Sequence, residues 1–137
     1  MDHSGESITA LSLCTGIRGL ERGIERVVGP IRTLAYVEIE AALVENLVVG
    51  IEAGKLAPAP IWSNLKTFPF GAFHGRIFIV LGGYPCQPFS TAGRRKGTED
   101  PRHLWPHIER GIGSARPLCC FFENVLGNLR LVFNQFS

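Results

Sequence analysis

The residues best suited to chemistry stand in one loop, residues 82–93, which reads Gly-Gly-Tyr-Pro-Cys-Gln-Pro-Phe-Ser-Thr-Ala-Gly. Cys86 lies between Pro85 and Pro88, whose rings fix φ on either side of it, so a rigid turn presents the thiol. An apolar run at residues 76–81 precedes the loop and predicts a buried parallel strand that ends at the glycine pair. Because α/β sheets bind ligands beyond the carboxyl ends of their strands, we expect Cys86 to take part in chemistry.

The start of the chain predicts the unit that would accompany such a loop. A strand is expected over residues 8–14, and Thr15 and Gly16 break it. Apolar residues then recur at the spacing of a helix, which ends at Gly29: Ile17, Leu20, Ile24 and Val27 or Val28. A strand, a glycine turn and a helix open a nucleotide-binding α/β unit, since the helix N-terminus offers free N–H groups to a ligand.

The later segments continue this alternation of strands and helices. Further strands are expected over residues 32–37, 61–62 and 118–122, and helices over residues 41–51 and 105–113. Leu43, Leu47 and Ile51 share one face of the second helix, while residues 68–73 predict a packed connection. Together with residues 76–81 this makes five strands of a mostly parallel, Rossmann-like α/β sheet.

Glu38 is the best candidate for binding a nucleotide ribose. It ends the second predicted strand, roughly 20 residues after the glycine turn, where an acidic residue accepts hydrogen bonds from ribose hydroxyls. A solvated carboxylate at the end of a strand is the alternative. Taken alone, the glycine turn and Glu38 also suit a dinucleotide-dependent oxidoreductase, which would leave the loop around Cys86 unexplained.

Three segments together resemble the DNA (cytosine-5) methyltransferases, over most of residues 8–127. Residues 82–93 look like the catalytic loop of that family, and residues 12–20, Ser-Leu-Cys-Thr-Gly-Ile-Arg-Gly-Leu, are similar to its first cofactor-binding motif. Residues 123–125, Glu-Asn-Val, match a third motif. Cys14 stands where the family usually has an aromatic residue, Arg18 where it has a glycine, and Asn64 where it has an aspartate.

The resemblance implies S-adenosylmethionine as cofactor, double-stranded DNA as partner and carbon 5 of cytosine as methyl acceptor, as in restriction-modification enzymes. It makes Cys86 the nucleophile and Glu123 the acid at the N3 atom of the cytosine ring. The implied cofactor-binding residues are Cys14, Thr15, Gly16, Ile17, Gly19, Glu38, Ile39, Asn64, Leu65, Gly83 and Leu104. The implied DNA-binding residues are Gln87, Ser90, Arg94, Arg95, Lys96 and Arg102, which include the concentrated positive run at residues 94–96.

Composition excludes several other classes of protein. The chain has 137 residues, 45% of them hydrophobic, and a net charge of +2, and it shows neither a spanning segment nor a signal peptide. We therefore expect an intracellular, cytoplasmic protein, and the resemblance to restriction-modification enzymes implies a bacterium or phage as its source. Its four cysteines form no Cys-x-x-Cys pair, and we interpret Cys119 and Cys120 as core residues. His103 and His107 are four residues apart, but Pro106 falls between them, so no metal site is expected.

Only the front half of the family's pattern is matched. We expect a flexible N-terminus over residues 1–7, a partial catalytic domain over residues 8–127 and a truncated tail over residues 128–137. A second chain could supply the C-terminal half with its target-recognition region. The alternative is an inactive fragment or a regulatory module that binds S-adenosylmethionine or DNA.

Overall fold

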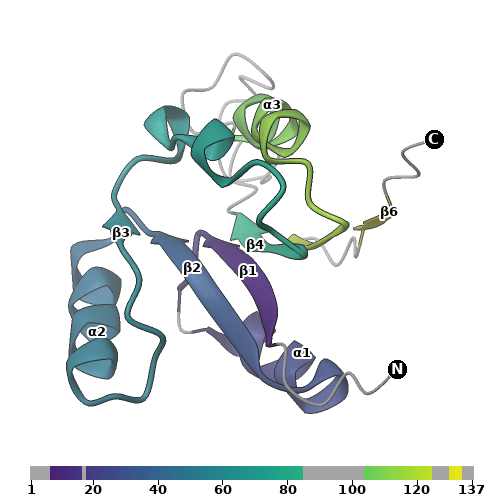
Figure 1. Ribbon diagram of the computed structural model, residues 1–137. Helices are drawn as coiled ribbons and strands as arrows, with labels where there is room; N and C mark the ends of the chain where they lie inside the picture. Colours follow the sequence, from purple (N-terminus) through teal and green to yellow (C-terminus); the bar gives the residue numbers. More distant parts are fainter. Residues whose placement is uncertain (1–6, 17, 85–103, 125–129, 134–137) are drawn as a thin grey trace.

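A six-stranded sheet with strand order β3-β2-β1-β4-β5-β6 forms the centre of the molecule (Figure 1). The computed structural model describes residues 7–16, 18–84, 104–124 and 130–133. The strands are β1 (Ile8–Leu13), β2 (Ile31–Val37), β3 (Ile61–Trp62), β4 (Ile79–Tyr84), β5 (Cys119–Asn124) and β6 (Arg130–Phe133). The α-helices are α1 (Gly19–Val28), α2 (Ala41–Glu52) and α3 (Trp105–Ala115), and two 3₁₀ turns, η1 (Leu65–Thr67) and η2 (Phe70–Phe73), precede β4.

The strand order decides which face each helix covers. β1 to β5 pair in parallel, and β6 pairs antiparallel with β5. The chain steps from β1 through β2 to β3 in one direction and from β4 to β5 in the other. Because crossovers between parallel strands are right-handed, α1 and α2 lie on one face, and α3 with the 3₁₀ turns lies on the other (Figure 1). The predicted α/β fold with a mostly parallel sheet is confirmed.

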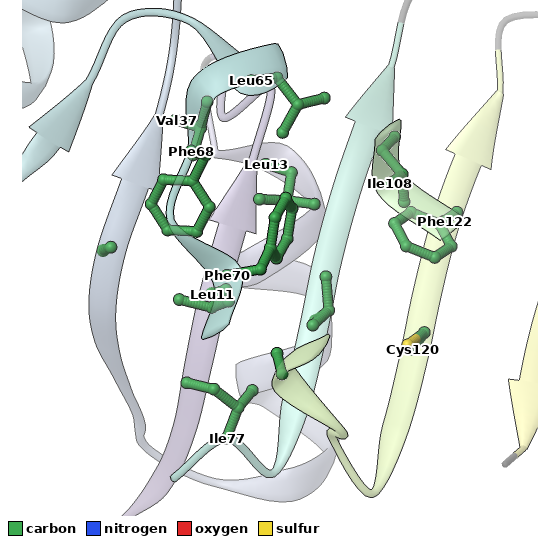
Figure 2. Packing of buried hydrophobic residues seen from close by; sticks show 13 residues of the cluster. Leu11, Leu13, Val37, Leu65, Phe68, Phe70, Ile77, Ile108, Cys120 and Phe122 are labelled. Carbon is green, nitrogen blue, oxygen red and sulfur yellow. The ribbon is translucent and has the colours of Figure 1, made fainter. Parts of the chain in front are cut away.

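The larger core lies between the sheet and the layer of η1, η2 and α3. Leu11 and Leu13 of β1 face this layer, together with Phe122 of β5. Phe68 and Phe70 pack edge to face against each other, with ring centroids 4.8 Å apart (Figure 2). The predicted packed connection over residues 68–73 therefore forms part of the core.

The other face of the sheet carries a smaller core under α1. Ala10, Ile31, Ile79 and Leu81 are buried there, and the half-buried Leu20 and Ile24 of α1 pack against them. Val27, predicted as one alternative for the apolar face of this helix, is instead 85% exposed, and Val28 is 47% exposed. No helix within the described part of the chain is long and apolar enough to cross a membrane.

Two further expectations are corrected by the sheet. The strand predicted at residues 76–81 begins at Ile79 and runs on through the glycine pair to Tyr84. At Gly82 the strand requires a glycine, because a Cβ there would lie 2.8 Å from the Phe122 ring. The sequence also did not predict β6, which lies in the segment expected to be a tail.

Gly111 of α3 tests how tightly this layer packs. A Cβ at Gly111 would lie 2.4 Å from the buried Phe70 ring, whereas a Cβ at Gly113 of the same helix would meet no described residue within 4 Å. We expect Gly111→Ala to lower the free energy of unfolding by about 1–3 kcal/mol through overpacking. Gly113→Ala is the control and should raise it by about 0.5–1 kcal/mol through helix propensity. Urea unfolding of both variants measures this, and a gain in stability for Gly111→Ala would contradict the packing described.

Candidate functional site

The candidate site residues gather at the carboxyl edge of the sheet, around the point where the strand order reverses. β1 and β4 are neighbours there, and Leu13 pairs with Gly82. In open α/β sheets ligands bind outside the strand ends at such a switch point. The glycine turn follows β1, Glu38 follows β2, and Glu123 lies near the end of β5, so neighbouring strands bring these groups to one edge.

The turn after β1 is held in an unusual backbone conformation. Cys14, Gly16 and Arg18 all have positive φ, at 51°, 52° and 60°. Only Gly16 adopts this region without cost, so the surrounding contacts must hold the other two. Thr15 provides one such contact, since its backbone N–H donates to the carbonyl of Val37 at 3.2 Å. The turn is thereby tied to the end of β2.

Glu38 makes the strongest contact between the two strand ends. Its carboxylate is 5% exposed and accepts the N–H of Gly16 at 2.7 Å on one oxygen and the N–H of Glu40 at 3.0 Å on the other. Backbone donors to a carboxylate are charge-assisted and roughly twice as strong as neutral pairs. Glu38 thus joins the glycine turn to the start of α2. A carboxylate has about four acceptor positions, so two remain for a ligand.

A buried polar group beneath the turn was not predicted from the sequence. Glu21 of α1 is 3% exposed and accepts a hydrogen bond from the Ser12 hydroxyl, which lies 2.9 Å from the Thr15 hydroxyl. Among the described residues no hydrogen-bond partner is found for the second Glu21 oxygen or for Nε of Arg18. The sequence does hold a signal for the burial of Glu21. Glu21 lies four residues after Ile17, so helical spacing places it on the apolar face of the helix.

The other expected cofactor-binding residues surround this edge in different environments. Ile39 is 74% exposed beside the buried Glu38, and Gly83 has open space where a Cβ would be. Asn64 is exposed and caps η1, since its Oδ1 accepts the N–H of Lys66 at 3.0 Å. Leu65 and Leu104, in contrast, pack in or against the larger core, and Leu104 is also the N-cap residue of α3. Gly19 is the first residue of α1, and Ile17 lies outside the described residues.

Of the two expected catalytic residues, only Glu123 can be placed. Glu123 is exposed and pairs with Gly83 across β4 and β5. Neighbouring strands lie about 4.8 Å apart, so the carboxyl group sits one strand away from the chain that leads to Cys86, three residues after Gly83. The remaining expected residues lie outside the described part: Cys86, Gln87, Ser90, Arg94, Arg95, Lys96 and Arg102.

Two of the other cysteines are unsuited to nucleophilic chemistry. Burial, with the Glu38 carboxylate nearby as a second cause, raises the pKa of the Cys14 thiol from 9.0 to about 12. Burial likewise raises the pKa of Cys120 to about 12, and this residue is 1% exposed in the core, as expected. Both thiols stay protonated at neutral pH, and a thiol attacks as its thiolate.

The described residues contain no group of three or more side chains that could hold a metal ion. The proline between the two histidines at residues 103 and 107 does not end a helix there. Pro106 lies in the first turn of α3, where a missing N–H costs no intrahelical bond. His107 is therefore helical, and His103 lies outside the described residues.

The residues at this edge fit a nucleoside-bearing cofactor such as S-adenosylmethionine. Among the described residues two backbone donors use the Glu38 carboxylate, Ile39 offers an exposed apolar side chain, and a Cβ at Gly83 would meet no described residue within 4 Å. A Cβ at Gly16 would meet no described atom closer than 3.9 Å, so the surroundings of this glycine are also open. An acid for hydroxyls, an apolar surface for a base and bare backbone are the features that such a ligand requires.

Comparison with known proteins agrees with the fold and the motifs. Residues 8–132 match the family described as C-5 cytosine-specific DNA methylase. A mutant of Spodoptera frugiperda DNMT2 shares this α/β fold at a TM-score of 0.61 and 21% identity, over 87% of this chain and 36% of that one. The chain belongs to the C-5 cytosine-specific DNA methylase family.

Two curated relatives are bacterial type II methyltransferases. M.NgoMIV of Neisseria gonorrhoeae is 30% identical over 132 residues, which cover 93% of this chain and 39% of that protein. M.BanI of Aneurinibacillus aneurinilyticus is 32% identical over 126 residues, which cover 88% of this chain and 27% of that protein. The chain therefore spans well under half the length of these two relatives.

Glu38→Gln tests the connection between the two strand ends. The amide keeps one acceptor but turns an NH₂ group toward the other backbone N–H, which leaves a buried donor unpaired. We expect the free energy of unfolding to fall by about 1–3 kcal/mol. Glu40→Gln is the control, because Glu40 is exposed and its side chain makes no capping bond, and it should stay within about 0.5 kcal/mol. Equal losses for both variants in urea unfolding would contradict the role of Glu38.

Proposed function

We propose that this chain carries the catalytic edge of an enzyme that transfers a methyl group from S-adenosylmethionine to carbon 5 of cytosine in double-stranded DNA. The observation that carries this proposal is the pairing of Gly83 with Glu123. This pairing puts the exposed Glu123 one strand away from the segment that leads to Cys86. The turn after β1, which suits a nucleoside, lies at the same edge of the sheet. Residues 8–127 would form this part of the catalytic domain.

Cys86 is proposed as the nucleophile. Carbon 5 of cytosine belongs to an aromatic ring and attacks electrophiles poorly. A thiolate that adds to carbon 6 breaks the aromaticity and makes carbon 5 electron-rich. When carbon 5 has gained a methyl group and lost its proton, the bond between sulfur and carbon 6 breaks and the thiolate leaves with its electron pair. The aromatic ring is thereby restored.

Glu123 is proposed as the acid at N3. Addition of the thiolate moves negative charge toward N3, and a proton or hydrogen bond from the Glu123 carboxyl would stabilise it. Glu123 is exposed in this chain, so a substrate base can reach it directly.

The turn after β1 and the end of β2 are proposed to hold the cofactor. When bound, S-adenosylmethionine supplies an electrophilic methyl group. The free acceptor positions of Glu38 would bind its ribose hydroxyls, and Ile39 would lie against its adenine. Asn64 would accept from the adenine amino group through the second lone pair of its carbonyl oxygen.

The DNA must present its cytosine outside the base stack, because the target atoms are inaccessible within a duplex. The cationic side chains of Arg94, Arg95, Lys96 and Arg102 are proposed to hold phosphates, which gives affinity without sequence preference. Gln87 and Ser90 of the catalytic loop are proposed as additional DNA contacts.

Transfer of labelled methyl from S-adenosylmethionine to mixed-sequence duplex DNA tests the proposal. Cys86→Ser should abolish transfer, since a serine hydroxyl is not ionised at neutral pH, while cofactor binding by calorimetry is retained. Glu123→Gln should slow transfer by about 10²–10⁴-fold through loss of the acid. The matched control is Glu109→Gln, an exposed glutamate of α3 outside the proposed site, which should transfer at the wild-type rate.

Residual turnover in Cys86→Ser would remove Cys86 from the mechanism, and an unchanged rate in Glu123→Gln would remove the acid. Cofactor binding without transfer by the wild-type chain would instead indicate a binding module.

A further inference from the structure

A groove in the α3 layer lies beside the site at the sheet edge. It lies between η1, η2 and α3 and has a volume of about 320 Å³. Phe68 and Phe70 contribute to its lining, and so do two cationic side chains, Lys66 and Arg110, and the imidazole of His107. None of the described residues that line it is acidic.

The surroundings of the groove extend this charge. Residues 63–84 and 104–118 contain four lysine or arginine residues, Lys66, Arg76, Arg110 and Arg116, and a single acidic residue, Glu109. Residues 7–62, which form β1, β2, β3, α1 and α2, contain five lysine or arginine residues and six glutamates. The positive charge is therefore concentrated on the layer that forms the groove.

Arg110 is oriented within the groove by an uncharged partner. One of its terminal nitrogens lies 3.0 Å from Nδ1 of His107, one turn earlier on α3. The guanidinium is the donor in this bond, because it has no acceptor atoms, so Nδ1 of His107 accepts and carries no proton. The bond fixes the direction of the Arg110 side chain without neutralising its charge.

The chemistry of the groove favours a phosphate over a protein segment. Protein partners bind tightly where an aromatic or aliphatic anchor enters an apolar pocket. Here Phe68 and Phe70 are only 7% and 6% exposed, since their rings are used by the core (Figure 2). The exposed part of the lining includes the cationic side chains of Lys66 and Arg110, which suit an anionic backbone.

The groove also adjoins the candidate site. Leu65 lines it and directly follows Asn64, while His107 lies three residues after Leu104, the N-cap of α3. An extended anion that occupied both the groove and the candidate site would need to run along the surface of the α3 layer. A DNA duplex is such an anion, since its backbone extends on either side of the target base.

We propose that this groove binds the phosphate backbone of the substrate DNA away from the target cytosine, through Lys66 and Arg110. The proposal rests on the proposed function for the identity of the polyanion. The contact would add affinity for any sequence and would fix the direction in which the duplex leaves the catalytic edge.

The test is a salt titration of binding to a fluorescent 30-base-pair duplex of mixed sequence, followed by anisotropy. The double variant Lys66→Gln/Arg110→Gln should bind several-fold more weakly at low salt. Its slope of log K against log salt concentration should be smaller than that of the wild type by about 2, since each lost phosphate contact removes about 0.9. The control is Arg22→Gln/Lys55→Gln, two exposed cations outside the groove, which should match the wild type.

A second variant separates charge from folding. Arg110→Lys keeps the positive charge and should keep the wild-type slope. If Arg110 had a purely structural role, Arg110→Lys would lose that role just as Arg110→Gln does. An unchanged slope in the double variant, or an equal loss in the control, overturns the proposal. Poly-glutamate serves as a probe for an acidic protein partner. If the double variant loses poly-glutamate binding but keeps DNA binding, the proposal is overturned in favour of such a partner.

Methyl transfer measured on the same samples separates this inference from the proposed function. The wild-type chain could transfer no methyl group while the double variant still shows a smaller salt slope than the wild type. That result would support DNA binding in the groove and count against the proposed enzymatic activity. Transfer with an unchanged slope in the double variant would do the opposite.

Discussion

The carboxylate of Glu38 is the interaction on which the rest of the site depends. It is almost completely buried, and it joins the N–H of Gly16 to the N–H of Glu40, so the turn after β1 and the start of α2 share one charged acceptor. A buried carboxylate is costly unless backbone donors satisfy it, and here they do. The same group keeps acceptor positions for a ligand. Structural support and the proposed recognition of the ligand therefore fall on one side chain.

The arrangement of the sheet explains why chemistry gathers at one edge. The strand order reverses between β1 and β4, so the helices that follow them lie on opposite faces and leave the strand ends open. Gly82 allows the ring of Phe122 to lie against β4, and β4 and β5 pair in parallel up to Tyr84 and Asn124, which includes the pair of Gly83 and Glu123. The two layers also differ in charge: α1 and α2 together carry four glutamates and two arginines, whereas η1, η2 and α3 carry one lysine, one arginine and one glutamate.

The sequence predicted the elements well where periodicity and burial agree. The face of α2 that contains Leu47 and the short strand β3 were both expected, and both are confirmed. It predicted the glycine pair wrongly as a strand end, because the role of Gly82 depends on the distant Phe122. The buried Glu21 was missed because composition alone makes a helical glutamate look solvated. The groove beside Arg110 combines elements far apart in the chain, so no local pattern could show it.

Trapping the reaction on DNA that contains 5-fluorocytosine would test the central claim most directly. A fluorine on carbon 5 cannot be removed as a proton is, so the bond between Cys86 and carbon 6 would persist after methyl transfer. We predict a denaturation-resistant complex that forms only with S-adenosylmethionine and whose peptide around Cys86 carries the methylated, fluorinated base by mass spectrometry. A wild-type chain that binds cofactor and DNA but forms no complex, or a complex that forms equally in Cys86→Ser, would contradict it.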